Sequence, residues 1–169
     1  VRAIVGCNAV VALAAIVGDP ASALNERETL NVNYEATKTL VEICNYYHIE
    51  RFVFASSCSV YGANSRIVLN EGSWLNPVSL YARTRVMSEQ IILGRCESYV
   101  KPVILRLATV YGQSPRMRYD LVVNILSAKA VKSRSVQIYG GDQWRPFVHV
   151  KYAAEAFFRA LEAPAEVAT

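Results

Sequence analysis

Short apolar runs alternate with long amphipathic stretches along this chain, and that alternation restricts the fold more than any other feature. Apolar runs bounded by turn residues are typical of buried strands, and three of them occur at Ala9–Ala15, Arg51–Ala55 and Pro102–Leu107. Apolar positions spaced by three or four predict helices between these runs, over residues 26–47 and 79–97. Such alternation predicts a parallel sheet with helices on both faces. The expected fold class is α/β, with a doubly wound parallel sheet.

The two ends of the chain continue this pattern more weakly. Val1–Gly6 looks like the end of a helix that lacks its own beginning. Beyond the third apolar run, the sequence predicts a helix, a short strand and a final helix, at 118–131, Ser135–Tyr139 and Val150–Leu161.

Composition excludes several classes of protein. Hydrophobic residues make up 53% of the 169 residues and charged residues 19%, which predicts one folded domain with a sizeable core. The formal net charge of +4 is spread thinly, without a basic run, so we expect no nucleic-acid binding. The apolar run at residues 9–18 is shorter than the roughly 20 residues that span a bilayer, so we expect no membrane insertion.

The cysteines and histidines predict neither a metal site nor disulfides. The four cysteines are far apart and the two histidines stand alone, which is typical of reduced thiols in a cytoplasmic protein. Cys58 lies beside Ser57, but no histidine is near it in the sequence, so a thiol nucleophile is disfavoured.

Polar and small residues follow each predicted strand. In open parallel sheets, ligands bind beyond the carboxyl ends of the strands. Here those ends are Leu13–Ile16, Ser56–Ser59 and Ala108–Gly112. The sequence therefore predicts one shared site at this edge of the sheet.

Tyr81 and Arg85 lie four residues apart on one predicted helix and so share a face. Tyrosine has an unperturbed pKa of about 10 and is a poor base at neutral pH. A nearby positive charge favours the phenolate, and a hydroxyl such as that of Ser57 can orient the reacting oxygen. These three residues therefore predict proton-transfer chemistry.

These segments match, in order, the motifs of a known family. Asn33–Thr37 is similar to its Asn-Val-x-Gly-Thr helix motif, Ser57–Gly62 to its serine motif ending in Val-Tyr-Gly, and Tyr81–Arg85 to its Tyr-x-x-x-Lys motif. Leu105–Gly112 resembles the next strand with its substrate loop, and Arg145–Val150 resembles the late arginine motif. Nearly the whole chain therefore resembles the extended short-chain dehydrogenase/reductase family, in its NAD-dependent nucleotide-sugar epimerase/dehydratase branch.

The resemblance implies a partial Rossmann-like sheet that lacks its N-terminal strands, with a small C-terminal substrate-binding portion. Residues 1–112 would be the C-terminal part of a dinucleotide-binding domain. Residues 113–169 would bind substrate and return a final helix to the core. The family uses NAD, with NADP left open here, and takes a nucleotide-sugar substrate. It commonly forms homodimers through two helices that correspond to 26–47 and 79–97.

The resemblance also implies roles for individual residues. Ser57 would hydrogen-bond the sugar hydroxyl or ketone, and Tyr81 would exchange its proton while hydride passes to or from the nicotinamide. The cation at position 85 would hold the nicotinamide ribose and keep the tyrosine pKa down. Thr109 and Arg145 would contact the substrate, the arginine at its diphosphate. The residues expected to line the cofactor are Leu13, Ala14, Ala15, Ile16, Asn33, Tyr81, Arg85 and Ala108.

The chain departs from the family pattern at its start and at Arg85. The family begins with a strand and a Gly-x-x-Gly-x-x-Gly turn that receives the pyrophosphate, and this sequence has neither. We therefore expect an incomplete sequence or a naturally truncated protein. Arginine keeps the charge of the usual lysine but cannot place the same donors on the ribose, so we expect weakened activity. Ala12 and Tyr152 are lesser departures, at positions where histidine and aspartate are frequent.

The residues after Ser57 bear on the reaction. Sugar 4,6-dehydratases carry an Asp-Glu pair there, because eliminating water needs a further acid and base. This chain has Cys58 and Ser59, which disfavours dehydration. We expect an NAD-dependent epimerase or oxidoreductase acting on a nucleotide-linked sugar. The alternative is a catalytically impaired module that binds a nucleotide sugar or a protein partner.

Overall fold

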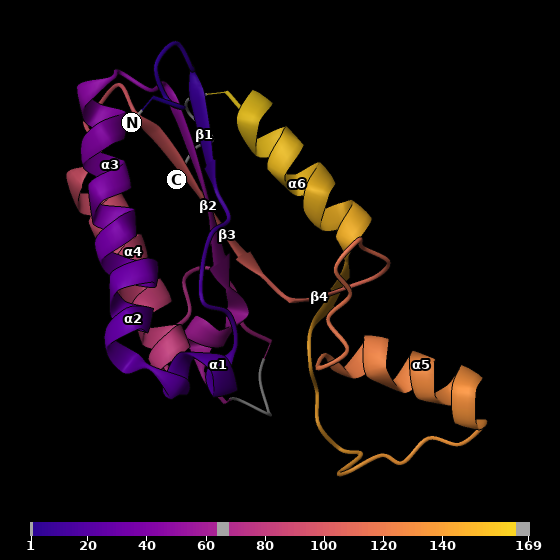
Figure 1. Ribbon diagram of the computed structural model, residues 1–169. Coiled ribbons are helices and arrows are strands. Elements are labelled where there is room, and N and C mark those ends of the chain that lie inside the picture. Colours follow the sequence, from indigo (N-terminus) through magenta and orange to yellow (C-terminus); the bar gives the residue numbers. More distant parts are fainter. Residues whose placement is uncertain (1, 64–67, 165–169) are drawn as a thin grey trace.

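A three-stranded parallel sheet forms the centre of the molecule (Figure 1). The computed structural model describes residues 2–63 and 68–164. In spatial order, the strands of the main sheet are β1 (Ala9–Ala12), β2 (Arg51–Ser57) and β3 (Lys101–Leu107). The central strand is buried on both faces along Phe52, Val53 and Phe54, which is why its apolar residues are consecutive rather than alternating. The predicted parallel sheet is confirmed.

The chain between β1 and β2 folds into consecutive helical segments. These are α1 (Asp19–Leu24), α2 (Glu26–Leu30), the π-helical turn η1 (Asn31–Glu35) and α3 (Ala36–Tyr46). The Asn25 side chain accepts the Glu28 N–H and so caps α2. After β2 comes α4 (Leu80–Arg95), which Ser79 caps in the same way at the Ala82 N–H. Both predicted helices are present, although a π-turn interrupts the first.

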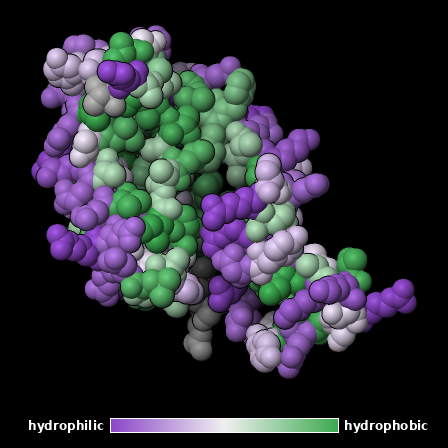
Figure 2. Space-filling model, viewed as in Figure 1, coloured by the Kyte–Doolittle hydropathy of each residue, from purple (hydrophilic) through white to green (hydrophobic). Residues whose placement is uncertain are grey.

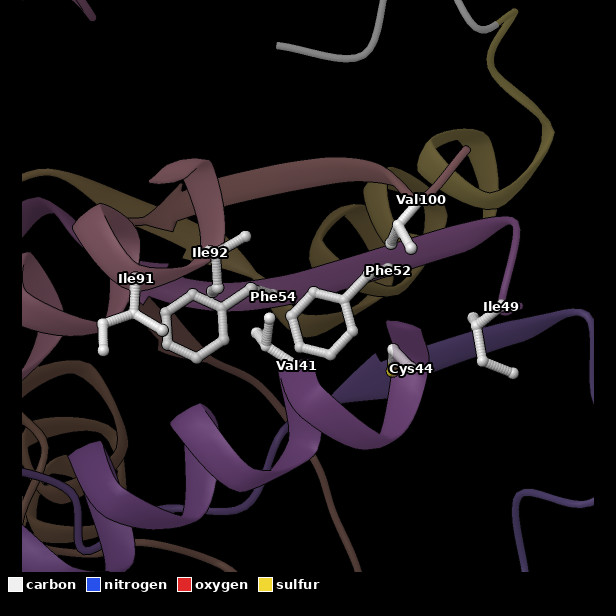
Figure 3. Close-up of a cluster of buried hydrophobic side chains, with 8 residues drawn as sticks. All are labelled: Val41, Cys44, Ile49, Phe52, Phe54, Ile91, Ile92 and Val100. Carbon is white, nitrogen blue, oxygen red and sulfur yellow. The ribbon is translucent and has the colours of Figure 1, made fainter. Parts of the chain in front are cut away.

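Helices α3 and α4 cover one face of the sheet and enclose the core. Figure 3 shows Phe52 and Phe54 of β2 directed toward Val41 of α3 and Ile92 of α4. Burying one such side chain contributes about 1.5–3 kcal/mol. The buried cluster contains Val41, Cys44, Ile49, Phe52, Phe54, Ile91, Ile92 and Val100.

Helix α6 (Val150–Glu162) covers the opposite face and contacts β2 and β3 (Figure 1). Its buried residues are the small Ala153 and Ala160. Because helices cover both faces of a parallel sheet, the fold is α/β and doubly wound, as predicted. Within the described residues, no helix combines the length and apolar character that crossing a membrane requires.

Beyond β3 the chain forms a second, two-stranded parallel sheet from β4 (Thr109–Tyr111) and β5 (Phe147–His149). Between these strands, α5 (Val122–Ser133) projects away from the main sheet and buries none of its residues (Figure 1). Strands as short as β4 and β5 contain too few residues to show a period.

Several local predictions were wrong. The first strand ends at Ala12 rather than Ala15, and residues 2–6 form turns instead of a helix end. The expected strand at Ser135–Tyr139 is an exposed stretch without strand pairing. Apolar and β-branched residues form a strand only where a neighbour offers hydrogen bonds and packing, and none lies beside this stretch.

Strand β1 forms one edge of the main sheet. Val11 is 37% exposed, and Leu13 just beyond the strand is 60% exposed. Figure 2 shows a continuous apolar area over β1 in the view of Figure 1. An exposed apolar edge strand is a surface on which other chains can pair.

Candidate functional site

The segments that follow β1, β2 and β3 carry most of the predicted site residues. Leu13–Ile16 follows β1, Ser57 ends β2, and Ala108 follows β3. Because the strands are parallel, all three segments open on one edge of the sheet. Of the residues expected to line a cofactor, Leu13 and Ala14 are exposed, whereas Ala15, Ile16 and Ala108 are half-buried.

Ser57 begins a tight turn at the end of β2. Its hydroxyl oxygen accepts the Ser59 N–H at 3.2 Å and so caps the 3₁₀ turn η2 (Cys58–Tyr61). Gly62 ends this turn at φ +72°, and a Cβ there would lie 2.0 Å from the Asn76 carbonyl oxygen. Only glycine fits this position, which explains the glycine of the Val-Tyr-Gly motif. The turn leaves the Ser57 side chain at the carboxyl edge of the sheet.

Tyr81 and Arg85 lie side by side in the first half of α4. The guanidinium carbon of Arg85 is 5.3 Å from the centre of the Tyr81 ring and 5.2 Å from that of Phe54. One terminal nitrogen, Nη1, donates to the Ala55 carbonyl at 3.1 Å. Ala55 lies two residues before Ser57 on β2. Arg85 therefore connects the tyrosine of α4 to the strand that ends in the serine.

Arg85 is nearly enclosed, with only 2% of its surface exposed. Its Nε and Nη2 atoms are buried and have no hydrogen-bond partner among the described residues. Burial lowers the pKa of this guanidinium, while Tyr81 and Glu89 act in the opposite direction. Two N–H groups are thus available to an acceptor, but the side chain must turn to present them.

Asn33 joins three segments of the chain. Its Oδ1 accepts the Ile16 N–H at 2.8 Å, and its Nδ2 donates to the Ile16 carbonyl at 3.0 Å and to the Thr84 hydroxyl at 3.2 Å. The Asn33 carbonyl also accepts the hydroxyls of Thr37 and Ser88. Asn33 is fully buried, so it fixes the segment after β1 to helix α4.

Two of the three predicted substrate residues, Thr109 and Arg145, come close together through the second sheet. Thr109 pairs with Phe147, and its N–H donates to the Pro146 carbonyl at 3.1 Å. Arg145, the residue before Pro146, is exposed. The pairing of β4 with β5 therefore brings the backbone of Arg145 beside the start of β4, while its side chain lies in solvent.

Sequence reasoning missed a buried ionic cluster behind the Ser57 turn. Glu89 of α4 accepts from Arg106 of β3, with Nη2–Oε2 at 2.8 Å and Nε–Oε1 at 3.1 Å, and also accepts the Ser56 hydroxyl. Arg106 donates through Nη1 to the Tyr61 hydroxyl at 2.9 Å. We call Glu89, Arg106, Ser56 and Tyr61 the Glu89 cluster. An arginine inside an apolar strand is a sequence signal for such a cluster, because a buried charge needs a partner.

The described residues contain no group of three or more His, Cys, Asp or Glu side chains that could hold a metal ion.

The whole sequence, residues 1–169, matches the family described as "NAD dependent epimerase/dehydratase family". The chain belongs to this family.

Curated relatives from the family are similar to this chain over most of its length. A Bacillus subtilis (strain 168) protein, "Uncharacterized UDP-glucose epimerase YtcB", is 34% identical over 134 residues, which are 78% of this chain and 42% of that protein. A "Putative UDP-glucose 4-epimerase" of Methanocaldococcus jannaschii is 33% identical over 135 residues, 78% of this chain and 44% of the relative. This chain thus spans about half the length of the relatives it matches.

Solved structures of the family share this fold. The chain aligns with MoeE5 in complex with UDP-glucose and NAD at a TM-score of 0.85 and 32% identity, covering 96% of this chain and 55% of MoeE5. It also aligns with UDP-N-acetylglucosamine 4-epimerase from Methanobrevibacter ruminantium M1, in complex with UDP-N-acetylmuramic acid, at a TM-score of 0.86 and 30% identity. That alignment covers 95% of this chain and 53% of the epimerase. The fold is therefore a partial Rossmann-like fold of epimerase type.

Proposed function

We propose that this chain carries the serine–tyrosine part of an NAD-dependent epimerase or oxidoreductase acting on a nucleotide-linked sugar. Two contacts of Arg85 support this proposal most strongly: its guanidinium packs on the Tyr81 ring, and its Nη1 donates to the carbonyl of Ala55, two residues before Ser57. Arg85 thereby links the helix that carries the Tyr81 phenol to the strand that ends in Ser57.

In this proposal each of the three residues has a separate task. The Ser57 hydroxyl hydrogen-bonds the oxygen of the reacting carbon and orients it. The Tyr81 side chain accepts the proton from that oxygen as the phenolate and returns it as the phenol. Arg85 supplies a positive charge beside the ring.

NAD is the proposed cofactor, on the strength of the family match and of the NAD complexes among the structural neighbours. When bound, it would accept and return a hydride. If the Arg85 side chain turned outward, its unpartnered Nε–H and Nη2–H groups would donate to the oxygens of a ribose. The segment Leu13–Ile16, with Asn33 behind it and Ala108 beside it at the same edge, would line the cofactor.

The proposed substrate is a nucleoside diphosphate sugar, the class of ligand bound in the complexes of MoeE5 and of the M. ruminantium epimerase. Thr109 would contact the sugar and Arg145 the diphosphate, because a guanidinium binds phosphate oxygens in pairs.

Cys58 and Ser59 supply no acid–base pair for eliminating water. Burial raises the pKa of the Cys58 thiol, which further favours epimerisation or simple oxidoreduction over dehydration.

A catalytically impaired module is the second candidate, and the burial of Arg85 favours it. The side chain is 2% exposed and bonded to the backbone of β2, so it presents no donor to a ligand unless it turns. A module of this kind would bind a nucleotide sugar or a protein partner without turnover.

The test measures NAD retention and turnover of UDP-sugars by the full-length gene product. Tyr81→Phe should lower kcat at least about 100-fold, the contribution typical of a positioned acid–base group. Arg85→Lys should raise kcat, because the three donors of a lysine lie on one ammonium at the end of a flexible stem and can turn toward the cofactor ribose. Arg83→Lys, at an exposed position of the same helix, is the matched control and should change nothing. A wild-type protein that retains NAD or a nucleotide sugar on purification but converts no UDP-sugar would favour the impaired module instead.

We also propose a homodimer formed through α2–α3 and α4. A surface hollow of about 650 Å³ lies between α2, η1 and α4, and its lining includes Leu30, Tyr34 and Met87. Met87→Lys should then lower the sedimentation coefficient at a fixed protein concentration, and an unchanged coefficient would contradict this contact.

A further inference from the structure

The Glu89 cluster is a hydrogen-bonded set of buried and half-buried polar side chains, and the proposed catalytic roles leave it unused. Arg106 contacts both carboxylate oxygens of Glu89, and a third contact, Nε–Oε2, measures 3.3 Å. Arg106 also donates through Nη1 to the Tyr61 hydroxyl at 2.9 Å and to the Glu71 carbonyl at 3.2 Å. The Ser56 hydroxyl donates to Oε1 of Glu89, which also accepts from Arg106 Nε.

Burial distinguishes this pair from the ion pairs on the surface. The side chains of Arg106 and Glu89 are 19% and 3% exposed, whereas those of Arg159 and Glu155 are 77% and 44% exposed. The hydrogen bonds to Glu89 raise the pKa of Arg106, against the effect of partial burial. A buried pair is weak evidence for stability but fixes the geometry of the groups around it.

The cluster surrounds the Ser57 turn on both sides. Ser56, the residue immediately before Ser57, is bonded to Glu89. Tyr61, at the far end of the turn, is bonded to Arg106, which in turn is held by Glu89. Glu89 belongs to α4, the helix that carries Tyr81. The side chains of the cluster therefore connect both ends of the serine turn to the helix of the tyrosine.

The backbone alone does not make this connection. Ser57 pairs with Leu107, which fixes the end of β2 within the sheet but not against α4. Inside the turn, the Asn76 N–H donates to the Val60 carbonyl, and Asn76 belongs to the loop before α4 rather than to the helix. The hydrogen bonds from Ser56 and Arg106 to Glu89 are thus direct links between this part of the sheet and α4.

We propose that Glu89, Arg106 and Tyr61 are positioning residues that hold the Ser57 hydroxyl at its working distance from the Tyr81 phenol. This inference rests on the proposed function, because it assigns the cluster to the same serine–tyrosine pair. The cluster touches neither substrate nor cofactor in this proposal and acts only through the placement of the turn. Small displacements of a reacting group have large effects on rate, with about 1 Å costing on the order of 100-fold.

Two substitutions in the full-length gene product test the proposal by steady-state kinetics with a UDP-sugar. Tyr61→Phe removes one hydrogen bond and should lower kcat about 3- to 10-fold. Arg106→Met removes every bond from β3 to Glu89 and should lower kcat about 10- to 100-fold. In both variants KM should stay within about 2-fold, because substrate contacts are unchanged. Tyr99→Phe is the matched control: it removes a tyrosine hydrogen bond to Asn45 at the far end of α4 and should leave kcat unchanged.

Coupling to Ser57 separates positioning from general destabilisation. If Arg106 acts through Ser57, then Arg106→Met should lower kcat by less than about 2-fold once Ser57→Ala is present. Full multiplicative losses in the double variant, or a rise in KM with unchanged kcat, would overturn the proposal. If Arg106→Met does not fold, the same cycle with Tyr61→Phe gives the answer.

Amide hydrogen exchange supplies a measurement that needs no turnover. Residues 58–62 should exchange several-fold faster in Tyr61→Phe than in the wild type, while the core strand β2 keeps its protection. Unchanged exchange in the turn would overturn the inference even in an active enzyme. A wild-type protein without turnover would count against the proposed function, and the exchange result would still decide whether the cluster holds the turn.

Discussion

Replacing Asn33 by alanine tests whether one buried amide holds the segment after β1 in place. The substitution removes the bonds to both backbone groups of Ile16 and the bond to Thr84. The Asn33 carbonyl keeps its two hydroxyl donors, since these bind the backbone. The change therefore acts chiefly on the link between Ile16 and the helices.

The expected magnitude follows from the groups left without partners. A buried polar group without a hydrogen bond costs about 1–3 kcal/mol. The Thr84 hydroxyl still donates to the Tyr81 carbonyl, so the Ile16 N–H and carbonyl are the two groups left without a partner; Ile16 is half-buried, so each falls toward the lower end of this range. We expect Asn33→Ala to lower the free energy of unfolding by about 2–3 kcal/mol. Loss of about 1–2 kcal/mol at the Ile16 N–H corresponds to amide exchange that is about 5- to 30-fold faster.

Amide hydrogen exchange of the native protein is the assay, because it reports the Ile16 N–H directly. Asn31→Ala is the matched control: Asn31 lies in the same π-helical turn but is exposed, so its replacement should leave the Ile16 exchange rate unchanged. If NAD lies along this segment, Asn33→Ala should also weaken NAD binding. Equal exchange rates at Ile16 in wild type and Asn33→Ala would refute the reasoning.

Two further predictions concern thiols and the sheet edge. Burial raises the pKa of Cys44 to about 12 and that of Cys96 to about 11, so iodoacetamide at pH 8 should label both at least about 100-fold more slowly than exposed Cys7, as peptide mass spectrometry can show. Equal labelling in the native state would contradict this. At the sheet edge, exposed β1 should make the 169-residue chain self-associate. Val11→Lys should therefore lower the weight-average mass measured by sedimentation equilibrium. Ile138→Lys is the control, at an exposed apolar position outside the sheets, and should leave that mass unchanged. A concentration-independent monomer in the wild type would rule out association through this edge.

The layered fold could be predicted because its central strand, β2, is buried on both faces. Phe52, Val53 and Phe54 are consecutive apolar residues, a pattern that only a covered parallel strand explains well. The π-turn at Asn31–Glu35 could not be predicted, because its helical periodicity differs little from that of an α-helix over so few residues. The pairing of β4 with β5 depends on a contact across almost forty residues, which no local pattern reports.

The candidate site was predicted in part, for a related reason. Residues whose chemistry is local to one motif, such as Ser57, Tyr81 and Arg85, could be named from their spacing. The pairing of Glu89 with Arg106 could not, because it forms only where α4 meets β3. Arg106 within the apolar run of β3 was the available signal, since a charge in a buried strand requires a partner elsewhere in the chain.

The position of Arg85 now has a physical explanation that its sequence motif did not offer. Glu89, one turn further along α4, is bonded to Arg106 and Ser56, and Arg85 forms no ion pair with it within the described residues. A planar guanidinium can instead pack on the rings of Phe54 and Tyr81 and use one donor on β2, an arrangement less suited to a compact, strongly hydrated ammonium. Arginine at this position therefore keeps a cation beside the tyrosine but directs it toward the sheet. The positive charge beside the tyrosine is retained, and the reach of its donors beyond the sheet is reduced, which is why Arg85→Lys and Tyr81→Phe must be compared in the same protein.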